Sequence, residues 1–523
     1  MNTKLLFTLF CVAVSIVAVA QKKEMQTITE NDLKAHLEFI ASDNLHGRDF
    51  FTEVPGLNIA ADYLKAQCEK MGLKPGVDGY FQTIEMEAVT PDPERTVLRL
   101  KDENGKINFE TKDIFAMGGP AHSDTISGEV VFAGYGWYND QTKYNDTKDI
   151  DVKGKIVLVM TRTLEQSKTG ADPEMETEMK KLSRAMMGGA KALVLVNDPM
   201  NPNTEYIESV RKYATGGSLK LKDAKDGFVI PVRLIFGSEK LANKMLESTG
   251  KTLAGLQNEI NETEAPKSFA IKNLTTQVEL VKSRQIIEGK NIIAVIEGSD
   301  PELKNECVVF SAHYDHLGID GEGEVFNGAD DNGTGTVALL EIAEAFQSMK
   351  KKPKRSIVFA WVTGEEKGLL GSDYYSQNPV FPMKNTLVDI NLDMVGRSAE
   401  KEPELVDSET KSLAGPNGMY IISGRQSTEL LNISDKVCEE LGLVPSDELT
   451  KAFLTRSDYY HFYKNGVPIL GLSTGLHDDY HKTTDELEKI DFHKMKRVTQ
   501  YAFSVAYELA NQKKRLVVDK PVK

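Results

Sequence analysis

At 523 residues the chain is longer than one ordinary domain, so we expect at least two. With 40% hydrophobic and 27% charged residues, its composition is that of a soluble globular protein. A formal net charge of −15 argues against nucleic acid or an anionic membrane as the main partner.

The N-terminus carries the pattern of an export signal. Lys4 precedes an apolar run over residues 5–20, which is too short to span a bilayer comfortably. The run ends in Ala18-Val19-Ala20, the small-residue pattern of a signal-peptidase site, and a polar segment begins at Gln21. We therefore predict a signal peptide at residues 1–20 and a periplasmic or secreted protein without a stable membrane span. An uncleaved membrane anchor is the alternative.

Two helices are predicted after the signal. The first begins near Thr29 and places Leu33, Leu37 and Ile40 on one face. The second runs from Gly56 to about Gly72, where glycine can supply a left-handed cap.

Short β-type runs separated by turns follow, at residues 128–136, 152–159, 189–196 and 228–232. This pattern over residues 116–265 resembles a protease-associated domain, a small β-rich module that is often inserted into exopeptidases and receptors.

Strands and helices alternate from about Asn291 onward. Apolar, strand-like runs occur at residues 292–296, 308–311, 357–362, 387–392, 419–422 and 468–472, and the clearest intervening helix covers residues 336–349. Alternation of this kind predicts an α/β domain with a mixed, largely parallel central sheet flanked by helices.

Six residues able to bind metal or move protons stand in this second half, within the strings SAHYDH, NGADDNGTG, VTGEEKGLLGS, NLDMVGR and DDYHKTTDE. They are His313, Asp331, Glu365, Glu366, Asp393 and His481. His313, Glu366 and Asp393 closely follow apolar runs, and ligands of open α/β sheets bind beyond the carboxyl ends of the strands. Two imidazoles and three carboxylates suffice for two Zn²⁺ ions and leave one carboxylate for proton transfer.

The charge of this set also suits two zinc ions. Asp331, Glu366 and Asp393 supply three negative charges against four positive ones. The remaining positive charge favours a bound hydroxide and lowers the pKa of zinc-bound water towards ~7.

With these motifs in this order, residues 291–510 resemble the co-catalytic dizinc exopeptidases of metallopeptidase family twenty-eight. That family includes bacterial leucyl aminopeptidases and glutamate carboxypeptidase. The resemblance implies that His313 and Asp393 bind one zinc, that Glu366 and His481 bind the other, and that Asp331 bridges both. It also implies a cis peptide at Asp331-Asn332.

The same resemblance implies a mechanism and a domain plan. Glu365 would be the general base that takes a proton from the metal-bridging water and passes it to the leaving amine. Residues 21–115 would form the N-terminal part of a peptidase domain with the zinc exopeptidase fold, residues 116–265 an inserted protease-associated domain, and residues 266–515 the dizinc peptidase domain. The predicted function is that of an exported aminopeptidase acting on peptides.

Two further residues receive roles by resemblance. Asp315 corresponds to the carboxylate that orients the metal-bound imidazole of His313. Tyr480 precedes His481 and would donate a hydrogen bond to the developing oxyanion; a packed aromatic role is equally compatible with its position. His316 has no ligand role in the family pattern.

Three alternatives remain open. A glutaminyl cyclase shares the fold but uses one zinc, and an exopeptidase of the glutamate carboxypeptidase type needs basic residues in its specificity pocket. A receptor-like binding protein would keep the architecture without catalysis, but such relatives lose ligands and this chain retains all five.

Overall fold

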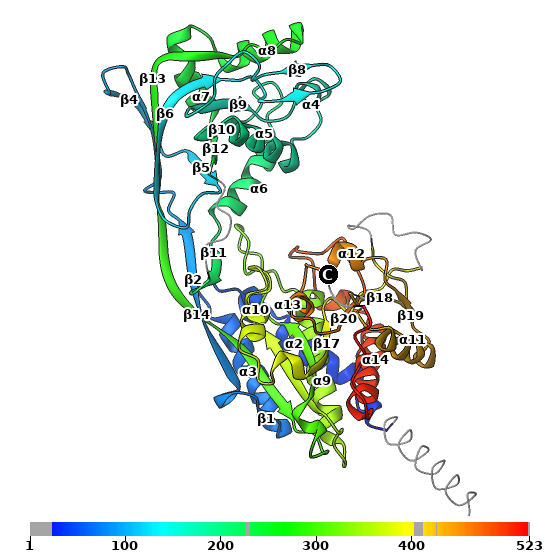
Figure 1. The fold of residues 1–523 in the computed structure, drawn as a ribbon. Helices are drawn as coiled ribbons and strands as arrows, with labels where there is room; N and C mark the ends of the chain where they lie inside the picture. Colours follow the sequence, from blue (N-terminus) through cyan, green and yellow to red (C-terminus); the bar gives the residue numbers. More distant parts are fainter. Residues whose placement is uncertain (1–22, 225–230, 402–411, 425, 521–523) are drawn as a thin grey trace, which may run out of the picture. The chain divides into compact units, whose positions relative to one another are not determined.

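The computed structural model describes residues 23–224, 231–401, 412–424 and 426–520. The predicted signal peptide lies outside these residues. The chain divides into two compact units, which we call the larger unit (residues 1–86 and 287–523) and the inserted unit (residues 87–286) (Figure 1). The inserted unit extends on both sides beyond the predicted boundaries of 116–265.

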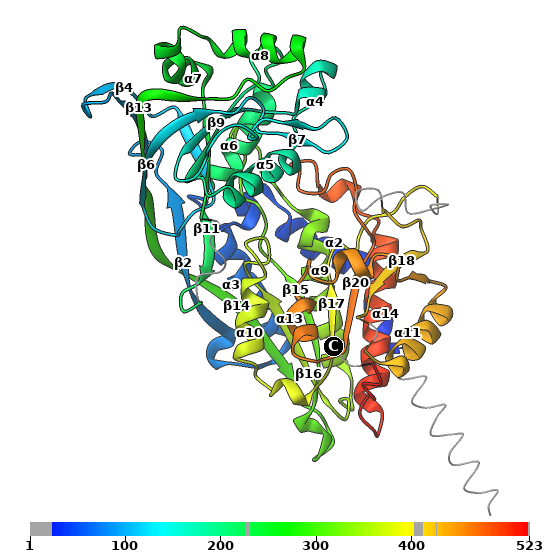
Figure 2. The same ribbon diagram turned by 45° about the horizontal axis from the view of Figure 1, so that its top comes forward.

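A mixed sheet forms the centre of the larger unit, with strand order β14-β16-β15-β17-β20-β18-β19 (Figures 1 and 2). Its strands are β14 (Lys282–Ile296), β15 (Cys307–His313), β16 (Ser356–Val362), β17 (Thr386–Leu392), β18 (Gly418–Ile422), β19 (Val444–Ser446) and β20 (Ile469–Ser473). Strands β16, β15, β17 and β20 pair in parallel in that order. Strand β14 pairs antiparallel with β16, and β18 pairs antiparallel with β20. The predicted mixed sheet with a parallel centre is confirmed.

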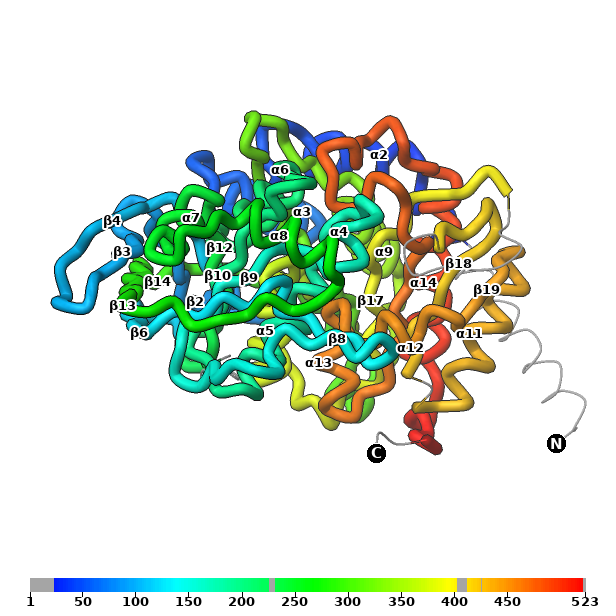
Figure 3. The backbone as a smooth tube through the Cα atoms, turned by 90° about the horizontal axis from the view of Figure 1, so that it is seen from above, coloured from blue at the N-terminus to red at the C-terminus, as the bar shows by residue number. Residues whose placement is uncertain are grey.

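Both faces of this sheet are covered by helices. One face packs against α2 (Glu30–Ile40), α3 (Gly56–Met71), α9 (Gly335–Ser348), α11 (Thr428–Leu441) and α14 (Phe492–Asn511). Helices α10 (Leu370–Gln377) and α13 (Tyr459–Lys464) contribute to the core on the other face. In Figure 3, α11 lies beside α14, which it also contacts. Because both faces are buried, the central strands are mostly apolar along their whole length rather than alternating between apolar and polar residues.

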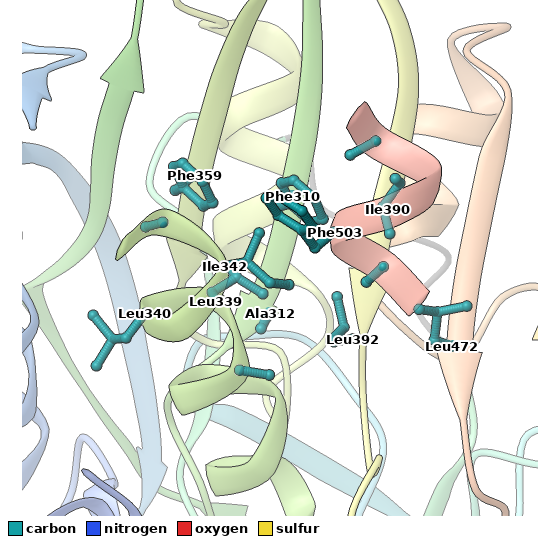
Figure 4. Close-up of a cluster of buried hydrophobic side chains, with 14 of the residues drawn as sticks. Phe310, Ala312, Leu339, Leu340, Ile342, Phe359, Ile390, Leu392, Leu472 and Phe503 are labelled. Carbon is teal, nitrogen blue, oxygen red and sulfur yellow. The ribbon is translucent and has the colours of Figure 1, made fainter. Parts of the chain in front are cut away.

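Aromatic and aliphatic side chains pack together in the core between β15, β16, α9 and α14 (Figure 4). Phe310 stacks on Phe359 with ring centroids 5.4 Å apart, and Phe346 lies 4.5 Å from Phe503. Burial of such a side chain contributes roughly 1.5–3 kcal/mol. This packing fixes the ends of the strands that carry the predicted ligands.

The two N-terminal helices form as predicted. Thr29 caps α2 by accepting a hydrogen bond from the backbone N–H of Asp32, and Leu33, Leu37 and Ile40 are buried. Gly72 ends α3 with a φ of 71°, the left-handed conformation that glycine adopts without steric cost.

The inserted unit is built on an eight-stranded sheet with the order β4-β3-β13-β6-β9-β10-β12-β5. The strands are β3 (Val97–Lys101), β4 (Ile107–Thr111), β5 (Ile114–Met117), β6 (Asp124–Phe132), β9 (Ile156–Met160), β10 (Ala192–Val196), β12 (Arg233–Gly237) and β13 (Phe269–Leu280). Helices α5 (Met175–Met187), α7 (Glu239–Leu246) and α8 (Leu253–Thr263) accompany it, and α7 contacts α8 (Figure 2). The predicted run at residues 228–232 lies partly outside the described residues, and β12 begins just after it.

No helix among the described residues is both long enough and apolar enough to cross a membrane.

A buried arginine ties together the loops beside the predicted site. The Arg48 guanidinium donates hydrogen bonds to four carbonyl oxygens, at 2.6 Å to Ile40, 2.9 Å to Tyr314, 2.6 Å to Asn327 and 3.0 Å to Gly328. Burial lowers its pKa to about 10, although the carboxylates of Asp331 and Asp315 act in the opposite direction and raise it. Arg48 therefore remains a cation that joins the chain after β15 to the loop before α9.

We expect Arg48→Met to destabilise the larger unit, because it leaves several buried carbonyl groups without a donor. Each such group costs about 1–3 kcal/mol, so the melting temperature should fall by at least roughly 6 °C. Thermal unfolding followed by circular dichroism measures this. Arg95→Met, at an arginine that is 66% exposed, serves as the control and should change little. A melting temperature equal to that of the wild type would contradict the structural role of Arg48.

A second prediction concerns Glu341 of α9, whose side chain is 3% exposed and lies 3.6 Å from His36. Burial, reinforced by Asp32 and Glu344, raises the pKa of Glu341 to about 8. The folded chain therefore keeps this proton up to about pH 8, whereas the unfolded chain loses it near pH 4.5. The contribution of this group to stability consequently falls as pH rises through this window.

We expect Glu341→Gln to raise the melting temperature relative to the wild type at pH 8.5 more than at pH 5.5, because glutamine stays neutral. Melting curves at the two pH values check this, with the exposed Glu508→Gln as a control on α14. If the difference in melting temperature between the variant and the wild type were the same at both pH values, Glu341 would not be a buried neutral carboxyl.

Candidate metal centre

Three neighbouring parallel strands deliver four of the predicted residues to one edge of the sheet. His313 is the last residue of β15, Glu365 and Glu366 lie in the turn after β16, and Asp393 directly follows β17. In the order β16-β15-β17, the two strands that follow β15 in sequence lie on its opposite sides. Open α/β sheets bind ligands at such a point, beyond the carboxyl ends of neighbouring strands from which the chain continues in opposite directions along the sheet.

Asp331 and His481 reach the same place from loops. Asp331 is buried in the turn at residues 329–334 before α9, and its peptide bond to Asn332 is cis, as the resemblance implied. Gly328 opens this turn with a φ of 53°, and a Cβ there would lie 2.2 Å from the carbonyl oxygen of Asp331. Only glycine lets the turn bring Asp331 to this position.

The Asp331 carboxylate faces the two predicted histidine ligands with different oxygens. Its Oδ1 lies 3.4 Å from His313 Nε2, and its Oδ2 lies 3.1 Å from His481 Nε2. His313 Nε2 is also 3.4 Å from Asp393 Oδ1, and His481 Nε2 is 3.2 Å from Glu366 Oε2. The structure thus brings all five predicted ligands together in two groups that share Asp331.

Glu365 lies beside the first group. Its Oε2 is 3.9 Å from His313 Nε2, and its side chain is 11% exposed. Burial raises the pKa of Glu365 well above its usual value, and the neighbouring carboxylates of Glu366 and Asp393 add to the rise against the opposing effect of His313. A carboxylate with a raised pKa has the proton affinity that a general base requires.

Asp315 lies beside both His313 and the turn after β16. Its carboxylate lies 3.8 Å from His313 Nδ1, beyond hydrogen-bond distance, whereas its backbone carbonyl lies 3.2 Å from that nitrogen. The carboxylate instead accepts hydrogen bonds from the backbone N–H groups of Glu365 at 3.2 Å and Glu366 at 3.3 Å. Asp315 therefore holds the turn that carries both glutamates, and its main chain orients the imidazole.

Tyr480 stacks on His481 with ring centroids 3.8 Å apart and is 36% exposed. Burial and the nearby carboxylates, first among them Asp331, raise the pKa of its hydroxyl. The hydroxyl therefore keeps its proton at neutral pH and can act as a donor.

A cleft opens over this centre. Tyr480, His481 and Asp393 line it together with the apolar side chains of Met394, Ile422, Phe453, Leu472 and Leu476 and with one cationic side chain, Arg456. The cleft thus combines a polar floor with a largely apolar wall.

Three contacting residues were not predicted from the sequence. His316 Nδ1 lies 2.8 Å from Glu366 Oε1, and Ser457 Oγ donates to Asp393 Oδ2 at 2.7 Å. Asp485 accepts hydrogen bonds from the backbone N–H groups of Asp330 and Asp331, both at 3.0 Å. His316 lies in the string SAHYDH and Asp485 in the string DDYHKTTDE, so their place in these motifs could have indicated a role in the site.

The donor atoms fit divalent zinc. Among the described residues, two clusters could hold a metal ion: His313, Glu365 and Asp393 form one, and His316, Asp331 and Glu366 the other. His481 also fits the second cluster, because its distances of 3.1 and 3.2 Å are near the separation of about 3.3 Å between ligand atoms around tetrahedral zinc.

The carboxylates also change the proton affinity of both predicted histidine ligands. Burial alone lowers the pKa of an imidazole, but Glu365 and Asp393 outweigh it at His313 and raise its pKa well above the usual value. Hydrogen bonds to Asp331 and Glu366 likewise raise the pKa of His481 to about 10. Cations compete with protons for these nitrogens, so the same carboxylates that attract the proton attract the metal.

Comparison with known proteins agrees with this geometry. Residues 291–506 match peptidase family M28, and residues 126–242 match the PA domain. Leucine aminopeptidase 2 of Trichophyton rubrum is 26% identical over 381 residues, which cover 68% of each chain. Aminopeptidase YwaD of Bacillus subtilis is 24% identical over 413 residues, covering 76% of this chain and 70% of the relative.

Solved structures share the fold. An aminopeptidase from Aneurinibacillus sp. strain AM-1 has a TM-score of 0.55 at 17% identity and covers 96% of this chain and 98% of its own. BSAP, a zinc aminopeptidase from Bacillus subtilis, has a TM-score of 0.53 at 20% identity, with 94% and 98% covered. The predicted family and PA domain are confirmed over the residues that match: residues 291–506 form a domain of peptidase family M28, and residues 126–242 form a PA domain.

Proposed function

We propose that this protein is an exported, zinc-dependent aminopeptidase that removes N-terminal residues from peptides with two zinc ions per chain. The observation that carries the proposal is the Asp331 carboxylate, which faces His313 with one oxygen and His481 with the other. Export is supported by the signal-peptide pattern at residues 1–20.

In this proposal His313 and Asp393 would hold one ion, Glu366 and His481 would hold the other, and Asp331 would contribute one carboxylate oxygen to each. When bound, the zinc ions polarise the scissile carbonyl and lower the pKa of water. The protein adds a fixed geometry, because its ligands come from strand ends packed by the core and from loops tied by Arg48.

Glu365 is the proposed general base. It accepts a proton from the attacking water and delivers it to the amine nitrogen of the leaving peptide. Its burial supports this role, since an isolated buried carboxylate gains more from accepting a proton than an exposed one. Tyr480 is proposed to donate its hydroxyl hydrogen to the oxygen on which negative charge develops.

The apolar wall of the cleft supports a preference for apolar N-terminal residues. Ile422, Phe453, Leu472 and Leu476 can surround an aliphatic side chain. The name of the Trichophyton relative, leucine aminopeptidase 2, agrees with this preference.

The domain plan predicted from the sequence is also proposed. Residues 21–115 and 266–515 would supply the peptidase domain and residues 116–265 the inserted module; the division of the chain into compact units supports wider boundaries for that module, near residues 87 and 286.

The activity is tested by hydrolysis of leucyl-arylamide with and without a zinc chelator. We expect cleavage that the chelator abolishes and added zinc restores, because the ions supply the electrophile. The same arylamide with an acetylated amine is the control and should remain intact. Cleavage that resists metal removal, or that accepts the blocked substrate equally well, would rule out a zinc aminopeptidase.

We expect Glu365→Gln to lower kcat by about 10²–10⁴-fold while the bound zinc stays at the wild-type level, because the amide cannot accept the proton. Steady-state kinetics and elemental analysis of the same sample measure the two quantities. Retention of most of the activity would exclude Glu365 as the base.

Zinc content also separates the alternatives. A glutaminyl cyclase would hold one ion per chain and cyclise N-terminal glutamine, and a carboxypeptidase would release residues from the other end of the peptide. A receptor-like protein would lack turnover altogether. The complete set of five ligand residues supports the dizinc enzyme.

A further inference from the structure

We propose that His316 is a positioning residue for the second metal ion: its Nδ1–H donates a hydrogen bond to Glu366 Oε1 and turns Oε2 towards the metal. This rests on the proposed function for the ligand role of Glu366 and goes beyond it by adding a residue that the five-ligand set does not contain.

The two oxygens of Glu366 have different partners. Oε1 lies 2.8 Å from His316 Nδ1, and Oε2 lies 3.2 Å from His481 Nε2. A carboxylate held on one side by a donor presents the other oxygen as a single ligand atom. The hydrogen bond therefore determines which oxygen of Glu366 is available to the ion.

Distances favour a hydrogen bond over direct coordination by His316. Its Nδ1 is 2.8 Å from Glu366 Oε1 but 4.0 Å from Asp331 Oδ2. Two ligand atoms of one tetrahedral zinc lie about 3.3 Å apart, so the first distance is too short and the second too long. A length of 2.8 Å is that of a hydrogen bond to a charged acceptor.

The burial of His316 favours one tautomer. The residue is 0% exposed, and its Nε2 has no hydrogen-bond partner among the described residues. The ionised carboxylate of Glu366 can only accept a hydrogen bond, so a contact of 2.8 Å to its Oε1 requires the hydrogen on Nδ1. The hydrogen therefore lies on Nδ1, where Glu366 accepts it.

The surrounding backbone is shaped for this ring. A Cβ on Gly328 would lie 2.5 Å from His316 Cδ2, so the glycine that forms the turn before Asp331 also makes room for the imidazole. The ring meets that of His481 edge to face, with centroids 6.0 Å apart. His316 is thus packed between the loop of the bridging ligand and the terminal histidine ligand.

The test is zinc binding by His316→Ala and His316→Asn. Asparagine can place an N–H near the position of Nδ1 but offers no imine nitrogen to a metal. The full-length enzyme is equilibrated in zinc buffers of graded free concentration, and the zinc bound per chain is measured by elemental analysis. His36→Ala removes another largely buried imidazole of the larger unit, 17% exposed, and is the matched control.

We expect the wild type and the His36→Ala control to bind two ions. His316→Ala should bind one ion 10–100-fold more weakly and the other with unchanged affinity. A loss of this size is usual when a metal ligand loses the hydrogen bond that orients it. His316→Asn should restore most of the lost affinity. Circular dichroism of the metal-free variants shows whether they fold as the wild type does.

Two results would overturn the proposal. Unchanged affinity for both ions in His316→Ala would remove any role in metal binding. Equal loss in His316→Asn and His316→Ala, with both folded, would make His316 a direct ligand. A wild type that binds no zinc would instead refute the proposed function, so the two failures are distinguishable.

Discussion

The placement of one carboxylate between two imidazoles is the constraint on which the rest of the site depends. Asp331 meets His313 at 3.4 Å and His481 at 3.1 Å through opposite oxygens. A small rotation of this carboxylate would break one of the two contacts. The backbone of Asp331 is held in place, because Asp485 accepts the hydrogen bond of its N–H and Gly328 provides the required turn.

Gathering several acidic groups in so small a volume is costly for the protein alone. Asp315, Asp331 and Asp485 are buried with Glu365 and Glu366 close by, and like charges at these distances repel. Burial raises the pKa of Asp315 to about 6 and that of Asp485 to about 7. Divalent cations bound among these groups would offset the repulsion, because each carries two positive charges.

The sequence predicted those parts of the site that depend on local order. His313, Glu366 and Asp393 follow mostly apolar runs, and strands of that kind become neighbours in a parallel sheet with their carboxyl ends at one edge. The helix pattern of Leu33, Leu37 and Ile40 was sufficient for α2 for the same reason, since spacing along one element decides which face is buried.

Contacts between distant loops were not predictable in the same way. The hydrogen bonds of Arg48 to Asn327 and Gly328 join residues about 280 positions apart, and no periodicity encodes them. The Asp315 carboxylate lies 3.8 Å from His313 Nδ1 and also accepts hydrogen bonds from the turn after β16, a contact that the sequence did not predict. His316 lacked a role in the family pattern, and only the folded loops show that it faces Glu366.

The adjacent glutamates show how such contacts assign different chemistry to identical side chains. Burial raises the pKa of both, and at Glu365 the opposing effect of His313, whose Nε2 lies 3.9 Å away, does not offset it. At Glu366 the hydrogen bonds from His316 and His481 outweigh burial and the charge of Asp331, and they lower the pKa to about 2. Glu366 is thereby kept as an anion suited to hold a cation, whereas Glu365 retains the proton affinity of a base. Neighbouring groups whose environments push their pKa values apart identify acid–base and ligand roles. The choice between the two glutamates therefore depends on which of them the histidines can reach.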